Sequence, residues 1–254
     1  MTLIQAIVLA FVEGFTEFLP ISSTGHLILA QKFLNISVTE FSKSFNIIIQ
    51  LSAILAVVVL YWKRILSSHR LWGQLAIAFI PTGILGFTLY KYVKGFLLDN
   101  VLVTAIALFL GGVVLLIVDR LPKLNQGNKA MSKLSTKNLI SIGLFQSLSM
   151  IPGVSRSAAS IVGGLFSNLS RVQAVEFSFL LAIPTMIAAT GYDLLKTGFS
   201  FTSQEYLLLG IGSVFSFIAS MIAIKAFTSF VAKNNFTVFA IYRIILAIII
   251  LWIL

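Results

Sequence analysis

The sequence of 254 residues has no cysteine, few acidic residues and few charged residues of any kind. The lack of cysteine excludes disulfide bonds, thiolate metal ligands and a cysteine nucleophile. Aspartate and glutamate together number only 8, and charged residues make up 10% of the chain. So few charges could not cover the surface of a soluble domain of this length. These absences exclude an ordinary soluble globular protein.

The apolar content instead places the chain in a membrane. Hydrophobic residues make up 58% of the sequence, and the mean hydropathy is +1.02. The 18 basic residues, which give a net charge of +10, lie in short polar gaps between apolar runs. Positive charge in such gaps marks loops that face the cytoplasm and its anionic lipids, so we expect no nucleic-acid partner. The first basic residue is Lys32, so we expect no cleaved signal peptide.

Six apolar runs approach the roughly 20 residues that a helix needs to cross the bilayer. They lie at about 44–62, 71–90, 100–118, 174–195, 205–225 and 237–254. Two pairs of shorter stretches lie at about 2–18 and 24–34, and at about 139–150 and 157–168. Proline, serine and glycine separate the members of each pair, as in re-entrant hairpins, whose irregular tips must be covered by protein or water. The sequence therefore predicts an all-α polytopic membrane protein with six spans and two re-entrant hairpins.

The two broken pairs resemble each other, which indicates an internal repeat. Alignment pairs Glu13 with Gln146 and Ser22 with Ser155, in both cases 133 residues apart. Three spans follow each hairpin, and because three is an odd number the repeats must have opposite orientations in the membrane. We divide the single membrane domain, 1–254, into a first repeat at 1–119, a basic linker at 120–137 and an inverted second repeat at 138–254.

The basic residues predict the orientation. The gaps at about 63–70 and 120–137 are the richest in lysine and arginine, and two spans separate them, which places both in the cytoplasm. The gaps at about 91–100 and 196–205 then face outward. The first hairpin enters from the outside and the second from the inside, so we expect their tips to meet.

We also expect the linker at 120–137 to be flexible. We expect the Arg243 side chain to reach the cytoplasmic interface by snorkelling.

Most ionisable residues within the apolar stretches lie in the two tips. Glu13 and Glu17 are four residues apart, which places both carboxylates on one face of a short helix. Ionisable groups in a membrane are costly and are usually functional or paired. The first tip continues with Ser22, Ser23, Thr24, Gly25 and His26. The second tip contains Gly153, Ser155, Arg156 and Ser157.

Each tip opens a return helix, and two helix amino termini that point at one place make an anion site. An arginine there adds a planar fork that suits phosphate oxygens. We therefore predict that phosphate binds to Ser22, Thr24, Gly25, Gly153, Ser155, Arg156 and Ser157. The carboxylates could hold a divalent cation, while the hydroxyls and the histidine could provide a nucleophile and a general acid or base.

The same residues also have structural interpretations. Serine and threonine favour helix N-caps, glycine favours tight turns, and His26 could be a satisfied core histidine. Arg156 could be an ion-pair partner of the two glutamates, and Glu176 could pair with Arg243 or Arg171. A purely structural set is disfavoured because several costly groups converge at matching ends of a repeat.

Two segments resemble the signatures of a known enzyme family. VEGFTEFLPISSTGH, at 12–26, looks like the first signature of the undecaprenyl pyrophosphate phosphatases of the bacitracin-resistance type, and IPGVSRSAAS, at 151–160, looks like the second. EFSFLLAIP, at 176–184, is also similar, and the hydropathy pattern agrees along essentially the whole chain. The second signature usually continues with glycine and threonine, where this chain has Ala158 and Ser160.

The resemblance implies hydrolysis of undecaprenyl pyrophosphate to the monophosphate, which recycles the carrier lipid for peptidoglycan synthesis. It also implies a homodimer in the bacterial inner membrane, a site open to the periplasmic side, and a divalent cation, Mg²⁺ or Ca²⁺. The positions that match the family's functional residues are Glu13, Glu17, Ser23, His26, Ser155 and Arg156.

The roles follow as hypotheses. Arg156 and the helix amides hold the pyrophosphate, and Ser23 attacks the terminal phosphorus with His26 as base or leaving-group acid. The opposite assignment, in which His26 attacks, stays open. Glu13 and Glu17 hold the metal or tune the histidine. The main alternative is a lipid or anion transporter or flippase, because inverted repeats with broken helices are the architecture of secondary transport.

Overall fold

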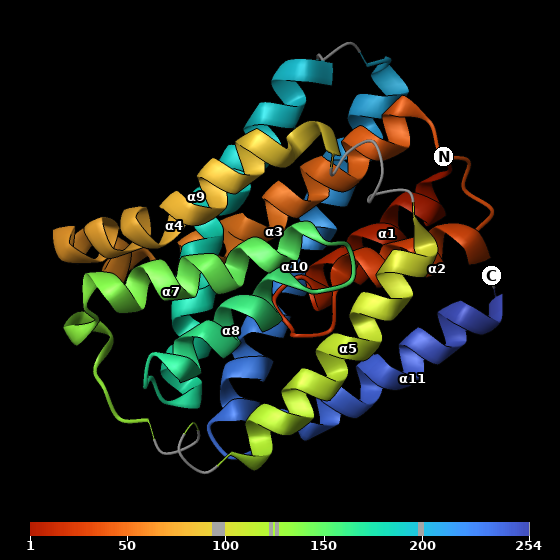
Figure 1. Ribbon diagram of the computed structural model, residues 1–254. Coiled ribbons are helices and arrows are strands. Elements are labelled where there is room, and N and C mark those ends of the chain that lie inside the picture. Colours follow the sequence, from red (N-terminus) through yellow and green to blue (C-terminus); the bar gives the residue numbers. More distant parts are fainter. Residues whose placement is uncertain (93–99, 122–123, 125–126, 198–200, 254) are drawn as a thin grey trace.

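The computed structural model describes residues 1–92, 100–121, 124, 127–197 and 201–253, and within these ranges every regular element is a helix (Figure 1). The first half of the chain contains α1 (Leu3–Thr16), α2 (Ser23–Phe33), α3 (Glu40–Ser67), α4 (His69–Tyr92) and α5 (Val101–Arg120). The second half contains α7 (Thr136–Ser147), α8 (Arg156–Phe166), α9 (Arg171–Thr197), α10 (Ser203–Val231) and α11 (Thr237–Ile253). Two short 3-10 turns, η2 (Met131–Lys133) and η3 (Leu148–Met150), flank α7.

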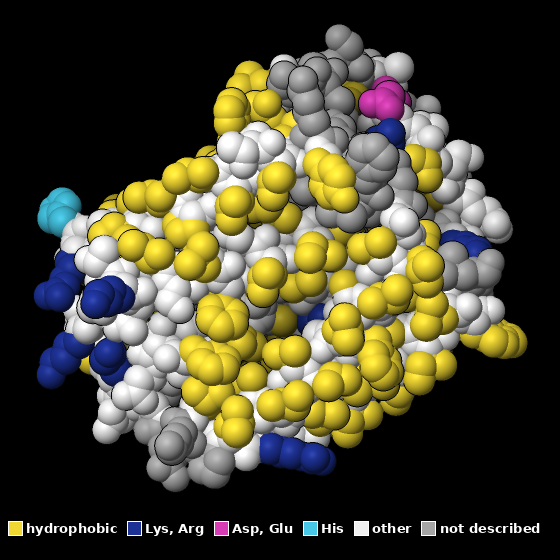
Figure 2. All heavy atoms as spheres, in the orientation of Figure 1, with side chains coloured by type: hydrophobic (Ala, Val, Ile, Leu, Met, Phe, Trp, Pro, Cys, Tyr) yellow, Lys and Arg dark blue, Asp and Glu magenta, His cyan; other side chains and the backbone are white. Residues whose placement is uncertain are grey.

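The predicted spans agree with the long helices. Helices α3, α4, α5, α9 and α10 are long and apolar enough to cross a membrane, and α11, over the sixth predicted span, is a shorter apolar helix of 17 residues. Apolar side chains cover the middle of the face in Figure 2, and basic side chains gather at its left edge, beyond the ends of α4 and α7. The prediction of an all-helical polytopic membrane protein is confirmed.

The two hairpins have matching lengths and caps. Helices α2 and α8 have 11 residues each and begin 133 residues apart, at Ser23 and Arg156. The serine before each helix, Ser22 or Ser155, has a positive φ of 67° or 74°. Each first helix, α1 or α7, begins with a capping box. Non-glycine residues seldom adopt positive φ, so the coincidence indicates one local backbone arrangement that the chain uses twice.

Each hairpin packs against the other half of the chain. Helix α1 packs on α10, and α7 packs on α4. Gly14 and Gly143 lie at these contacts, where an added Cβ would overlap the backbone of the partner helix. Ser220 Oγ donates a hydrogen bond to the Gly14 carbonyl at 3.2 Å, and Thr82 Oγ1 donates to the Gly143 carbonyl at 3.1 Å. The two halves are therefore interlocked, which holds both hairpins in fixed positions.

The linker differs from the prediction. Its described part, from residue 127 onward, is docked rather than free, because the Lys129 amide donates to the Asn168 carbonyl at 3.1 Å. Gln74 Nε2 donates to the Met131 carbonyl at 3.0 Å, and Met131 and Leu134 are buried. The apolar residues between the lysines thus anchor the segment. Residues 122–123 and 125–126, and residues 93–99 and 198–200 of the predicted outer loops, lie outside the described residues.

The expected pairings of Glu176 are also wrong. Its carboxylate accepts from Arg64 Nη1 at 2.8 Å, because α3 packs against α9 and brings Arg64 beside it. Arg171 instead lies 3.7 Å from the Asp119 carboxylate. Arg243, the other expected partner, is fully buried where α11 packs on α5.

Candidate active site

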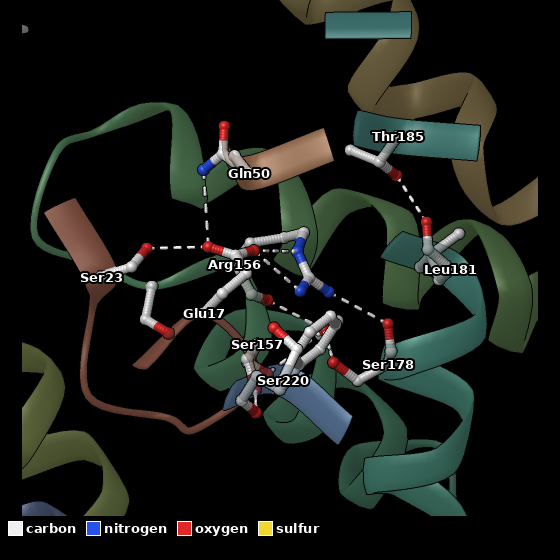
Figure 3. A network of polar contacts seen from close by, with 12 residues as sticks. Glu17, Ser23, Gln50, Arg156, Ser157, Ser178, Leu181, Thr185 and Ser220 are labelled. Atoms are coloured by element: carbon white, nitrogen blue, oxygen red, sulfur yellow. Dashed lines mark hydrogen bonds and ion pairs between the residues drawn. The ribbon is translucent and has the colours of Figure 1, made fainter. Parts of the chain in front are cut away.

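The two tips meet, as the sequence predicts. Ser157 Oγ, at the start of α8, donates a 2.7 Å hydrogen bond to the carbonyl of Phe18 in the first tip. Arg156, also at the start of α8, forms a buried ion pair with Glu17, 3.1 Å from Nη2 to Oε1 (Figure 3). These contacts join segments that are 139 residues apart in sequence. Groups from both hairpins therefore form one polar cluster.

Glu17 is at the centre of this cluster. Its Oε1 accepts from Arg156 Nη2 at 3.1 Å and from Nε at 3.4 Å. Its Oε2 accepts from Ser23 Oγ at 2.7 Å and from Gln50 Nε2 of α3 at 3.5 Å. A buried carboxylate with an arginine on one oxygen and a hydroxyl on the other can take a proton from that hydroxyl. Ser23 and Glu17 thus have the geometry of a nucleophile and its base.

Arg156 is held in place from several directions. Its Nη1 donates to the Ser178 carbonyl of α9 at 3.0 Å, and its guanidinium carbon lies 6.0 Å from the centre of the Phe18 ring. Ser160, one turn further along α8, donates to the Arg156 carbonyl at 2.8 Å and lies 2.7 Å from Ser178 Oγ. The three bonds from Arg156 to Glu17 and Ser178 use three of its five N–H groups. The remaining two can bind a further oxygen.

Glu13 has a different environment from Glu17. Its side chain is fully buried, and neither carboxylate oxygen has a hydrogen-bond partner in the described structure. The Asn46 Oδ1 atom of α3, one turn before Gln50, is likewise buried and without a partner there. An unpaired buried carboxyl group is costly, which makes Glu13 a candidate for binding a ligand. Unsatisfied oxygens beside Glu17 are the donors that hard divalent cations prefer.

In the described structure His26 makes no side-chain hydrogen bond with Ser23. Its Nδ1 lies 2.7 Å from the Ser22 carbonyl, and its Nε2 lies 2.7 Å from the hydroxyl of Tyr242 in α11. A carbonyl oxygen can only accept, so Nδ1 carries a hydrogen, and in the neutral imidazole Nε2 must accept from Tyr242. The two rings are nearly parallel, with centroids 5.5 Å apart. The structure therefore pairs Ser23 with Glu17 and His26 with Tyr242.

The other predicted phosphate-binding residues lie at the two helix starts. Ser155 Oγ accepts from the Ala158 amide at 3.2 Å, which makes it an N-cap, whereas Ser22 makes no such cap bond. The Ser157 hydroxyl hydrogen is used in the bond between the tips. Gly25 is required for packing, because a Cβ there would overlap Leu108.

Gly153 is required by its backbone conformation, and Thr24 is half-buried. Gly153 has a φ of 95°, a region that glycine adopts without strain. A Cβ at Gly153 would also overlap the Thr104 carbonyl of α5. Thr24 lies beside Ser23 in the first turn of α2, where its amide is among the free donors of the helix start.

An apolar cavity of about 470 Å³ adjoins the second tip. Helix α5 contributes residues from Val103 to Leu115, and the second hairpin contributes Val154, Ala158 and Ala159. Figure 2 shows the corresponding hollow between α5 and α8, with yellow side chains around it and a basic side chain at its bottom. The cavity thus lies between the apolar exterior and the second tip.

Sequence reasoning missed Gln50, Ser178, Tyr242 and Arg243. Gln50 and Ser178 lie in otherwise apolar spans, where isolated polar residues were a usable signal. Tyr242 and Arg243 are consecutive residues of α11, far in sequence from either tip, and only the packing of α11 on α5 brings them to the site.

Fold and site together define a polytopic helical membrane protein with hydroxyl, carboxylate and guanidinium groups buried where two helix starts meet. Residues 6–249 match the family described as Bacitracin resistance protein BacA. The undecaprenyl-diphosphatase of Aquifex aeolicus is 50% identical to this chain, over 98% of this chain and 97% of that protein. The protein of the same name from Wolinella succinogenes is 49% identical, over 99% of this chain and 98% of that one. The chain belongs to the BacA family.

Proposed function

We propose that this protein hydrolyses undecaprenyl pyrophosphate to undecaprenyl phosphate and inorganic phosphate. The observation that carries the proposal is the hydrogen-bonded series from Ser23 through Glu17 to Arg156, which combines a nucleophile, a base and an anion-binding group from two hairpins. Full-length relatives that carry the name undecaprenyl-diphosphatase support it. The product recycles the carrier lipid for peptidoglycan synthesis.

Ser23 is the nucleophile in this proposal, and Glu17 is its base. The Ser23 oxygen bonds to the terminal phosphorus, the bond from that phosphorus to the bridging oxygen breaks, and the lipid monophosphate leaves. The serine proton passes to Glu17 Oε2, 2.7 Å away. Water then attacks the phosphoserine and releases inorganic phosphate, with a proton returned to the serine oxygen through Glu17. The serine proton that Glu17 took in the first step leaves with the lipid monophosphate, before the water attacks.

Arg156 and the two helix starts hold the pyrophosphate. The first-turn amides of α2 and α8 that no cap or helix bond uses are donors at positive dipole ends, and the two unused N–H groups of Arg156 add a charged donor. Charge that develops on the phosphoryl oxygens in the transition state is stabilised where little water is present. In this arrangement the two N–H groups of Arg156 that do not bond to Glu17 or Ser178 are the ones that bind the pyrophosphate.

His26 has a supporting role in the proposal. Its Nε2 accepts the Tyr242 hydroxyl proton, so this lone pair is occupied and His26 is not arranged to attack phosphorus. His26 lies in the first turn of α2 beside Ser23 and can donate a proton toward the leaving phosphate once it is charged. Detection of phosphohistidine rather than phosphoserine in a trapped enzyme would reverse this assignment.

A divalent cation, Mg²⁺ or Ca²⁺, fits the carboxylates. Glu13 offers two buried oxygens without partners, and Glu17 lies one turn further along. Such a cation neutralises phosphate oxygens when bound. Without it, Glu13 places a second negative charge near an anionic substrate.

The isoprenoid chain of the substrate occupies the apolar cavity between α5 and the second hairpin. Val154 and Ala158 line the cavity and lie on either side of Ser155 and Arg156 in sequence, so the cavity adjoins the helix start that carries the proposed phosphate-binding groups. A lipid substrate thus reaches the polar cluster from within the bilayer and need not be extracted from it.

The membrane arrangement is proposed on the same basis. Matching hairpins, each followed by three apolar helices, support an inverted repeat with re-entrant hairpins. The basic gaps are cytoplasmic, and the site opens to the periplasmic side of the bacterial inner membrane. The protein acts as a homodimer.

Phosphate release from undecaprenyl pyrophosphate by the purified full-length protein, with and without EDTA, tests the function. Arg156→Ala is expected to lose about 100-fold or more in kcat, because a charged donor to the transition state is removed. Arg64→Ala, which removes the arginine that pairs with Glu176, is the matched control and is expected to stay near wild type. A folded wild type that releases no phosphate with added cation contradicts the proposal and favours the transporter, which reconstituted lipid transport would then test.

A further inference from the structure

Arg243 is fully buried in the middle of the protein. The sequence suggested that its side chain snorkels to the interface, but its exposed fraction is 0%. The guanidinium donates to four backbone carbonyls: Pro20 at 3.0 Å, Gly153 at 2.9 Å, Ala107 at 3.3 Å and Leu108 at 3.3 Å. The side chain turns inward because α11 packs closely on α5, where Gly111 leaves room for the guanidinium.

The four acceptors belong to three separate segments. Pro20 lies in the first tip, Gly153 in the second, and Ala107 and Leu108 in α5. Carbonyls in irregular tips have no helical partner, and in a membrane such groups must be satisfied within the protein. The guanidinium fork can satisfy several acceptors at fixed angles, which an ammonium group cannot do. Arg243 thus ties both tips to each other and to α5.

The charge of Arg243 is not neutralised by a neighbouring acid. Among the described residues, no carboxylate lies within 4.0 Å of it, whereas Arg156 pairs with Glu17. A buried cation held only by carbonyl dipoles is costly, and neutral donors could satisfy the same carbonyls. The retained positive charge lies beside the tips, where an anionic group of a substrate would reduce this cost.

We propose that Arg243 is a positioning residue for the reaction. It fixes the first tip, which supplies Ser23 and Glu17, against the second tip, which supplies Arg156, and its charge strengthens the site's attraction for the pyrophosphate. The inference rests on the proposed function for its substrate. The positioning itself rests on the four hydrogen bonds.

Substitution of Arg243 in the full-length protein tests the proposal. Arg243→Met keeps the length of the side chain but removes every donor, and kcat for undecaprenyl pyrophosphate is expected to fall about 100-fold, as for a misplacement of reacting groups by about 1 Å. Arg243→Lys keeps the charge but reaches fewer carbonyls, so its kcat should be about tenfold higher than that of Arg243→Met. Arg64→Met is the control, with kcat expected within about twofold of wild type because Arg64 bonds at the far end of α3.

Gly111→Ala displaces the guanidinium without removing it. A Cβ at Gly111 would overlap Arg243 Nη2, whereas a Cβ at Gly210 of α10 meets only open space. Gly111→Ala should therefore lower kcat about tenfold with little change in KM, while Gly210→Ala should not. Hydrogen exchange supplies a local readout, since the amides of residues 19–23 and 153–156 should exchange faster in Arg243→Met and in Gly111→Ala.

The outcomes distinguish the proposal from a general loss of stability. A folded Arg243→Met with wild-type kcat and unchanged exchange in the tips overturns it. A loss of activity that follows only the fraction of unfolded protein, with unchanged kcat per folded molecule, also overturns it. If Arg243→Met fails to fold, Gly111→Ala decides. If the wild type releases no phosphate, the proposed function fails, and faster exchange confined to the two tips still tests the positioning.

Discussion

The two hairpin tips have the same backbone and different chemistry. Ser22 and Ser155 have nearly the same positive φ, and each precedes a helix of 11 residues. The first tip carries the carboxylates and the histidine, whereas the second carries the arginine. At the position of Glu13 the second hairpin has Gln146, whose Nε2 donates to the hydroxyls of Thr82 at 3.1 Å and Thr185 at 3.0 Å.

The difference shows how a repeated fold can produce an asymmetric site. The shared backbone creates two helix starts that Glu17 links through Ser23 and Arg156, and helix starts favour anions. The proposed mechanism needs in addition a base, a nucleophile and a cation site, and the residues proposed for these roles all belong to the first hairpin. In the second hairpin Gln146 Nε2 donates to two threonine hydroxyls and Ser157 donates to the Phe18 carbonyl, so these groups are used in contacts within the protein.

The largest expected difference in kcat is between substitutions of the two buried hydroxyls in the tips, those of Ser23 and Ser157. Ser23 donates to a carboxylate and Ser157 to a carbonyl. Ser23→Ala removes the proposed nucleophile and should lower kcat by about 1,000-fold or more with little change in stability. Ser157→Ala removes a bond between the tips and should cost about 1 kcal/mol in unfolding free energy while most of kcat remains. Equal losses of kcat in the two variants would contradict the assignment.

The next largest effect on kcat is expected when Glu13 is replaced by glutamine, the residue at the matching position of the second hairpin. Glu13→Gln gives the first hairpin the residue of the second and removes a buried carboxyl group without hydrogen-bond partners, so kcat should fall about 100-fold while stability is unchanged or higher. The cation dependence of the remaining activity should weaken, which a titration with Mg²⁺ measures. Full activity in Glu13→Gln would exclude this carboxylate as a cation ligand.

Gln146→Glu is the reciprocal change and should act on stability. Thr82 and Thr185 already donate their hydroxyl hydrogens to the carbonyls of Gly143 and Leu181, so they can only accept from residue 146. A carboxylate there would have no donors, and the unfolding free energy should fall by about 3 kcal/mol. Thermal unfolding in detergent measures this loss, and a stable variant would show that the two hairpins are more equivalent than their contacts indicate.

Tyr242→Phe tests whether the hydrogen bond from Tyr242 to His26 supports catalysis. The substitution keeps the ring beside His26 and removes the hydroxyl on Nε2. A loss of about tenfold in kcat is expected, since the imidazole loses its fixed orientation but not its place in α2. Tyr206→Phe, in the exposed part of α10, is the control. A rise in activity would instead indicate that Tyr242 restrains a reactive imidazole.

Leu110→Trp tests whether the isoprenoid chain of the substrate occupies the apolar cavity beside the second tip. Leu110 lines the apolar cavity, whereas Leu102 of the same helix does not, and both are half-exposed. Leu110→Trp should raise KM for undecaprenyl pyrophosphate about fivefold, with little effect on a short isoprenoid pyrophosphate, because a filled cavity excludes only the long chain. Leu102→Trp should leave both values unchanged. The same rise in both variants would place the chain elsewhere.

The sequence predicted the helices of both hairpins because their apolar stretches are short and are broken by proline, serine and glycine. The repeat also predicted that Glu17 and Arg156 converge. Periodicity could not reveal which hydroxyl faces which carboxylate, since the choice of Glu17 over His26 as the partner of Ser23 depends on side-chain directions at an irregular turn. Arg243 was misplaced because its depth in α11 is compatible with snorkelling, and only the close contact of α11 with α5 turns it inward.

The smallest effect concerns the caps of the return helices. Ser155 Oγ accepts from the Ala158 amide, whereas Ser22 has no side-chain cap bond. Ser155→Ala should therefore lower the unfolding free energy by about 1 kcal/mol, and Ser22→Ala by less. Both substitutions leave the positive φ in place, so backbone strain contributes equally and the difference reports the cap alone. Equal losses would mean that the Ser155 bond is not maintained, and that the second helix start is as open to a phosphate as the first.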